Sequence, residues 1–153
     1  IDQYLQFEAY LSEKYTLSSG IRHTDVTLTA DNNKTPTYWS HNSWNYGATL
    51  PMASLSYSIN PLTNAYFSVG KGLDTPTLNQ IKYTSTYVLG GSNNQPNSNL
   101  ASSNTIQYEL GMKRKLSSNG IINLAIFDAE TTNEAVVDAS LSGKTAFSNA
   151  PKS

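Results

Sequence analysis

The sequence predicts an all-β protein, an antiparallel up-and-down meander that forms part of a transmembrane β-barrel of about six to eight strands. Three observations predict it. Apolar and polar residues alternate with a period of two along most of the chain. No stretch shows the periodicity of an amphipathic helix of normal length. Short connections between the alternating stretches are followed strictly by long ones, which places short turns at one end of the sheet and long loops at the other.

Each expected strand shows the alternation of a half-exposed β-strand. The third shows it most cleanly, because serines separate Ala53, Leu55, Tyr57 and Ile59. In the sixth, Phe127 falls on the otherwise polar face. The expected strands are 5–11, 16–24, 53–59, 65–70, 106–113 and 121–132, followed by a seventh that involves Val136, Val137 and 145–148.

The connections indicate where such a sheet belongs. The short turns are 12–16, 59–64 and 116–121, and the long loops, rich in Asn, Ser, Thr, Gly and Pro, are 30–44, 72–103 and 133–144. A soluble sandwich has no physical reason to sort its loops by length. Outer-membrane barrels have tight periplasmic turns and long extracellular loops. The sorting therefore favours a bacterial outer membrane, with its lipid as the partner of the apolar side chains.

The composition excludes several classes of function. Only 14% of residues are charged and the net charge is -1, so the chain offers no electrostatic surface for nucleic acid. The absence of cysteine excludes disulfides, thiolate zinc sites and cysteine nucleophiles. The sequence contains no run of eighteen apolar residues, which a membrane-spanning helix would require.

Matching the faces of the first two strands constrains their register. If their apolar side chains share one face, the turn contains an odd number of residues, for instance 13–15, and Leu11 opposes Leu17. Glu8 then lies diagonal to Arg22 on the polar face. We therefore expect an ion pair between Glu8 and Arg22 in the lumen of the barrel.

Four aromatic residues stand where strands meet connections. Tyr15 and Tyr57 lie beside short turns on the apolar phase, and Trp44 and Tyr46 lie where a long loop re-enters a strand. Strand ends would lie at the two boundaries of the membrane, where membrane barrels carry girdles of aromatic residues. Packing in an ordinary core is the alternative.

No catalytic, metal or cofactor site is predicted, and we do not expect an enzyme. The two histidines, His23 and His41, match no metal-site spacing, and no Gly-x-Ser-x-Gly motif is present. Gly70-Lys71-Gly72 lacks the spacing and the helix of a phosphate loop. The run 31–33 begins like a calcium loop but lacks the later glutamate.

Three passages resemble the TonB-dependent outer-membrane receptors. The first is Leu-Ser-Tyr-Ser-Ile-Asn at 55–60 with the strand and Pro-Thr segment at 64–79. The second is Asn-Leu at 99–100 with Tyr-Glu-Leu-Gly-Met-Lys at 108–113. The third comprises 123–127, 133–137 and Phe-Ser-Asn-Ala at 147–150. The order and spacing of the passages resemble the family more closely than any one passage does. Departures at Leu73, Ser98, 101–103 and Pro151 indicate a divergent member.

The resemblance implies that residues 1–153 are a fragment of the barrel domain of such a receptor, without its plug domain. Members of the family have roughly twenty-two strands around a plug. The resemblance implies energy-coupled uptake of a scarce ligand, and a ferric siderophore is the ligand that we expect. TonB would act through the plug domain.

Ligand recognition in this fragment would fall to aromatic residues of the long loops, since rigid strands hold such loops and their tips face outward. Flat rings could stack on an organic ligand, and packing within the loops is the alternative. The candidates are Tyr38, Trp39, His41, Trp44, Tyr83 and Tyr87.

A second class of function stays open from the sequence. The chain could form a small adhesive or structural β-domain, either an eight-stranded membrane barrel or a soluble sandwich.

Overall fold

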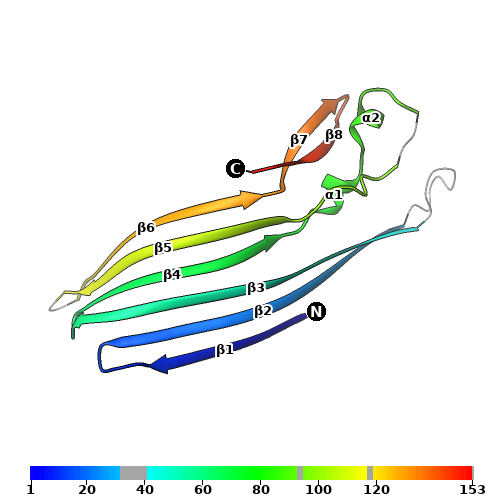
Figure 1. Ribbon diagram of the computed structural model, residues 1–153. Coiled ribbons are helices and arrows are strands. Elements are labelled where there is room, and N and C mark those ends of the chain that lie inside the picture. The colour runs from blue at the N-terminus through cyan, green and yellow to red at the C-terminus, as the bar shows by residue number, and fades with distance from the viewer. Residues whose placement is uncertain (32–40, 93–94, 117–118, 153) are drawn as a thin grey trace.

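The computed structural model describes residues 1–31, 41–92, 95–116 and 119–152 and has two antiparallel sheets (Figure 1). Six strands form a meander in chain order, and two form a separate hairpin. The all-β prediction is confirmed. The strands of the main sheet are β1 (Asp2–Tyr10), β2 (Tyr15–Asp31), β3 (His41–Asn60), β4 (Thr63–Asp74), β5 (Ser103–Lys115) and β6 (Ile121–Thr132); the hairpin is β7 (Glu134–Leu141) and β8 (Lys144–Ala150), and two short helices are α1 (Leu78–Ile81) and α2 (Ser85–Val88).

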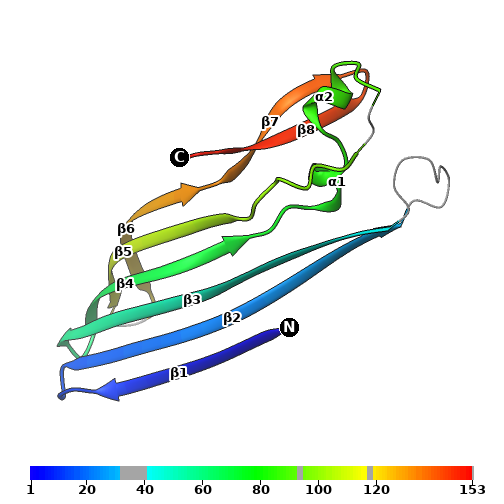
Figure 2. The ribbon, with the colours of Figure 1, turned by 45° about the vertical axis from the view of Figure 1, so that its right-hand side comes forward.

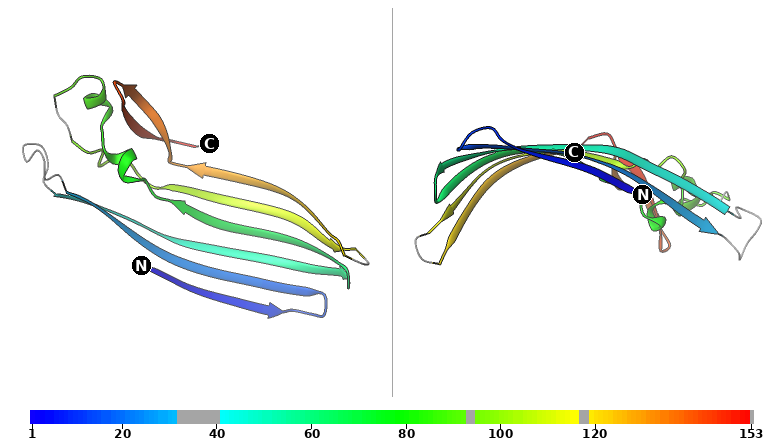
Figure 3. Two further views of the ribbon diagram at one scale, coloured as in Figure 1. Left: turned by 180° about the vertical axis from the view of Figure 1, so that it is seen from behind. Right: turned by 90° about the horizontal axis from the view of Figure 1, so that it is seen from below.

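The connections are sorted by length as predicted. The turns after β1, β3 and β5 lie together at one end of the sheet, which we call the turn end. The connection from β4 to β5, both helices and the β7–β8 hairpin lie at the other end, which we call the loop end (Figure 1). Within the described residues the main sheet is an open arc whose edges are β1 and β6 (Figure 3). It is a part of a barrel wall.

Side chains of opposite character occupy the two faces of the sheet. One row crosses from Leu17 to Leu55, Phe67, Leu110 and Ile126. We call this side the apolar face. The row that begins at Ser18 crosses to Ser54, Ser68 and Glu109 and belongs to the polar face.

Nothing among the described residues covers the apolar face. Leu55, Phe67, Leu110 and Leu124 are 40%, 46%, 52% and 65% exposed, whereas a soluble sandwich would bury them under a second sheet. The β7–β8 hairpin lies at the loop end and does not serve as that second sheet (Figure 1). An eight-stranded barrel does not form either, because the described strands divide into a sheet of six and a sheet of two.

The register of β1 against β2 differs from the predicted one by two residues. Leu17 opposes Ala9 rather than Leu11, because the turn consists of 12–14 and closes with the bond from the Leu11 amide to the Tyr15 carbonyl, at 2.9 Å. A shift of two residues keeps every side chain on its predicted face. The parity of the turn was therefore correct, and its position was wrong.

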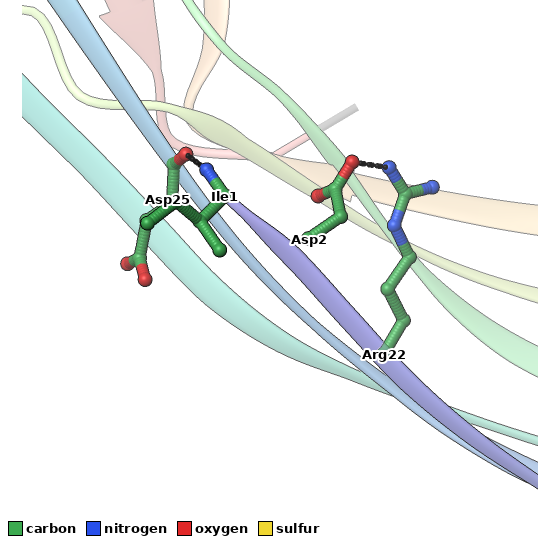
Figure 4. Close-up of polar contacts among 4 residues, drawn as sticks. All are labelled: Ile1, Asp2, Arg22 and Asp25. Carbon is green, nitrogen blue, oxygen red and sulfur yellow. Dashed lines mark hydrogen bonds and ion pairs between the residues drawn. The ribbon is translucent and has the colours of Figure 1, made fainter.

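The shift replaces the predicted lumen ion pair. Glu8 opposes Ser18 and accepts a hydrogen bond from the Tyr10 hydroxyl at 2.7 Å. Arg22 instead forms an ion pair with Asp2, at 2.8 Å (Figure 4). The prediction of a Glu8–Arg22 pair was wrong, although Glu8, Arg22 and Asp2 all lie on the polar face.

The sheet splits toward the loop end. β3 pairs with β2 from Tyr57 to His41, but its pairing with β4 stops at Met52, opposite Gly70. The next residue of β3 is Pro51, which has no amide hydrogen to extend a ladder. Beyond this point β2 and β3 diverge from β4 (Figure 2), and past Thr24 and Ala48, where the pairing with β1 also ends, they continue as a two-stranded ribbon.

Two predicted loops contain more strand than expected. β2 and β3 extend into both ends of 30–44, with Ala30 opposite Asn42 and Asp31 opposite His41. The predicted loop 133–144 is largely the β7–β8 hairpin, whose two-residue turn has positive φ at both Ser142 and Gly143, as a type I′ turn requires. In both places composition typical of loops is overridden by backbone pairing across the strands.

No helix in the described residues is long and apolar enough to cross a membrane.

A glycine on the polar face makes room for an aromatic ring. The Tyr66 side chain lies directly over Gly111 on the neighbouring strand, and its hydroxyl donates a hydrogen bond to Glu109. A Cβ at position 111 would lie 2.3 Å from the Tyr66 ring, far inside van der Waals contact. The glycine therefore allows the ring to lie flat on the sheet.

We expect Gly111→Ala to destabilise the full receptor in detergent by about 1–3 kcal/mol, because the new methyl group must displace the Tyr66 ring. Thermal unfolding measures the effect. Gly70→Ala is the matched control, since its Cβ would make an ordinary contact of 3.7 Å with Met52. Equal unfolding midpoints for the two variants would contradict the close contact of Tyr66 with Gly111.

Candidate ligand-binding site at the loop end

The hydrophobic core of the described residues lies at the loop end and not against the sheet wall. All the buried hydrophobic side chains fall into two clusters there. The first joins Trp44 to Ile81 and Leu100, and the second joins Val88 to Ala139 and Ala146. The connection between β4 and β5 is thereby packed onto both the β2–β3 ribbon and the β7–β8 hairpin.

Trp44 anchors this packing. The continuous register of β2 and β3 places Trp44 and Tyr46 on the polar face, opposite to Leu55. Trp44 is 8% exposed, and the Tyr46 hydroxyl donates a hydrogen bond to the Leu100 carbonyl at 3.1 Å. Burial raises the pKa of Tyr46 above its ordinary value. The prediction of a membrane girdle was therefore wrong for these two residues.

The other two predicted girdle residues stay together on the apolar side. Tyr15 opposes Tyr57 across β2 and β3, and their rings stack with centroids 4.8 Å apart. They lie beside the turns, at the height where amphipathic rings meet the boundary of a membrane. Their membrane contact remains a prediction.

Two asparagines hold the loop-end segments together. Asn149 of β8 accepts a bond from the Ala101 amide at 2.8 Å and donates to the carbonyls of Ala101 and Asn133, at 3.0 and 2.6 Å. Asn97 donates to the Phe147 carbonyl at 2.7 Å. An amide side chain can donate and accept at once, so each asparagine substitutes for a short stretch of strand pairing.

Two of the predicted ligand residues come together in one cluster. Tyr83 and Tyr87 stack with ring centroids 5.7 Å apart. The ammonium of Lys82 lies 5.2 Å from the Tyr83 centroid, and that of Lys144 lies 4.3 Å from the Tyr87 centroid. These are cation–π distances. We call these four side chains the lysine–tyrosine stack.

The remaining predicted ligand residues lie elsewhere. Trp44 lines a small cavity of about 180 Å³ together with Lys82 and Pro96. His41 lies at the start of β3, where its Nδ1 is 2.6 Å from the Asp31 carboxylate. Tyr38 and Trp39 fall outside the described residues. The structure thus brings Tyr83 and Tyr87 together and keeps His41 apart from them.

Sequence reasoning missed the two lysines. Lys82 is the only charged residue between Asp74 and Glu109, a signal that was readable from the sequence. Lys144 lies 57 positions from Tyr87 and meets it only because the hairpin folds back on α2.

A second hollow lies on the polar face, where β3 and β4 begin to separate. It has a volume of about 450 Å³ and runs over small residues that include Ser18, Ser54, Ser68 and Gly70, with Gln6 and Gln107 at its sides. The described residues contain no group of three or more potential metal ligands from His, Asp and Glu. Neither finding provides a catalytic or metal centre.

Comparisons with known proteins agree with this architecture. Residues 2–153 match the family described as TonB dependent receptor-like, beta-barrel. The chain is also similar in structure to the hemophore receptor HasR of Serratia marcescens, solved as a double mutant in complex with its hemophore HasA and heme. The TM-score is 0.61 and the sequence identity 15%, so this likeness shows the fold alone. It covers 97% of this chain but only 29% of the HasR chain.

We expect Asn149→Ala in the full receptor to speed amide hydrogen exchange at Ala101 by about tenfold or more, since it removes hydrogen bonds worth about 1 kcal/mol each. Asn149→Asp keeps the acceptor for the Ala101 amide, so exchange there should rise less. Asn123→Ala, on exposed β6, is the control and should leave this amide unchanged. Unchanged exchange in the alanine variant would show that Asn149 does not hold the segment.

Proposed function

Because the chain belongs to the TonB-dependent receptor-like β-barrel family, we propose that it forms part of the wall of a receptor that captures a ferric siderophore at the cell surface and takes it up in an energy-coupled step. As a member of that family, the chain is part of a bacterial outer-membrane protein. It spans 29% of the HasR chain, so ligand, partners and activity are proposed for the intact receptor.

The observation that carries the proposal is the uncovered apolar face. Its row from Leu17 to Ile126 crosses the sheet without meeting another protein layer in the described residues. Hydrocarbon is the environment in which such side chains are stable, and the backbone is satisfied by the strand ladders. The polar face would line the lumen, where a ligand could pass.

The loop end supplies the proposed capture surface. Tyr83, Tyr87 and Trp44 provide aromatic groups there, and the two packed clusters hold the segment that carries them. Rigid support of binding residues lowers the entropic cost of binding. Coupling to TonB would run through the plug domain of such a receptor. The plug is a different domain from the β-barrel that residues 2–153 match. Such a receptor binds and moves its ligand without covalent chemistry.

Deletion of the receptor gene tests the proposal. In an iron-starved strain, we expect uptake of a radiolabelled ferric siderophore to fall to background after deletion and to return when the full receptor is supplied. The same loss is expected in a strain that lacks TonB, because the step requires energy. Full uptake of every siderophore tried by the deletion strain would overturn the proposed function.

A further inference from the structure

In the lysine–tyrosine stack, two lysines contact a pair of stacked tyrosine rings, and the four residues come from two segments of the chain. Its order is Lys82, Tyr83, Tyr87 and Lys144, with the two ammonium groups at the ends of the ring pair. Lys144 also donates a hydrogen bond to the Tyr87 hydroxyl at 3.3 Å. Three members come from the connection between β4 and β5, and the fourth opens β8. The stack therefore exists only in the folded loop end.

The two lysines of the stack are not neutralised by a direct ion pair. Among the described residues, neither Lys82 nor Lys144 forms an ion pair with a carboxylate. No acidic residue occurs between Asp74 and Glu109. On the adjacent β7, Asp138 accepts a hydrogen bond from Ser85. Two cations thus flank a pair of aromatic rings at the end of the sheet that carries the long loops.

Lysines placed on tyrosine rings could serve only to pack the loop. Packing alone does not require a charge, since the aliphatic part of a lysine covers a ring equally well. Ammonium groups without an ion-pair partner, at the end of the sheet proposed to face outward, favour binding of an anion. Stacked rings favour a ligand with flat aromatic groups.

We propose that the lysine–tyrosine stack selects a ligand built from flat aromatic rings and carrying at least two negative charges. The proposal rests on the function proposed above, since it specifies the class of ligand that the receptor captures. Porphyrins with two carboxylates and ferric complexes of catecholates share this chemistry. A neutral ferric trishydroxamate lacks both the rings and the charge.

Binding to the full receptor in detergent tests the inference with three probes: hemin, ferric tris-(2,3-dihydroxybenzoate) and a neutral ferric trishydroxamate. The test variant is Lys82→Met with Lys144→Met, which keeps the aliphatic contacts with the rings and removes both charges. Lys82→Arg with Lys144→Arg keeps the charges. Lys115→Met, on the exposed turn end, is the matched control for lost charge. Equal unfolding midpoints establish that the variants fold.

We expect the parent to bind at least one anionic probe, and the double methionine variant to bind it about tenfold or more weakly, as the loss of charge-assisted contacts implies. The arginine variant and the Lys115 control should bind as the parent does. Binding of the catecholate supports both the inference and the proposed function, whereas binding of hemin alone supports the inference and overturns a siderophore as the ligand.

Two other outcomes are informative in different ways. If the parent binds only the neutral trishydroxamate, or if the methionine variant binds the anionic probe as tightly as the parent, the inference is overturned while the proposed function stands. If the parent binds none of the three probes, both are overturned.

Discussion

The structure depends on one constraint: a strand in hydrocarbon must satisfy its backbone hydrogen bonds through neighbouring strands while showing apolar side chains to the lipid. The ladders from β1 to β6 meet the first condition in the interior of the sheet. The apolar face meets the second, because Phe67, Leu110 and their neighbours are exposed and do not pack into a centre. Backbone pairing, rather than a hydrophobic interior, holds this wall together.

The small hydrophobic core follows from the same constraint. In the described residues, buried apolar side chains gather only at the loop end, where Trp44, Ile81 and Leu100 meet. This part of the chain extends beyond the continuous six-stranded pairing and must fold as a soluble protein does, by removing apolar area from water. The six-stranded sheet and the loop end are thus stabilised in different ways. The pairing of β3 with β4 ends near the boundary between these two regions.

The sequence predicted the strands and the faces because alternation is a local property. It also predicted the odd parity of the first turn, since a one-residue error would have turned Leu17 to the polar side. It could not predict the position of that turn, because 12–14 and 13–15 satisfy the same alternation. Arg22 was therefore assigned to Glu8 when its partner is Asp2. The pairing of β2 with β3 at 30–31 and 41–44 was missed because the Asp, Asn and Ser residues there are typical of loops.

The site was less predictable than the fold. Tyr83 and Tyr87 were chosen as loop aromatics, and they stack across the start of the short helix α2, four positions apart. The burial of Trp44 depends on Ile81 and Leu100, which arrive from a distant connection. No local pattern reports such contacts. The turn at Ser142 and Gly143 is a short-range signal for a hairpin, and it was readable from the sequence.

The proline that ends the β3–β4 ladder has a mechanical consequence. Hydrogen-bonded strands transmit a displacement to their neighbours, and this transmission stops where the bonds stop. Above Pro51 the β2–β3 ribbon is no longer bonded to β4, and above Thr24 and Ala48 it is no longer bonded to β1 either. A force on this part of the ribbon can therefore bend it without displacing the six-stranded part of the sheet. The same chain thus combines a rigid sheet with a flexible two-stranded extension.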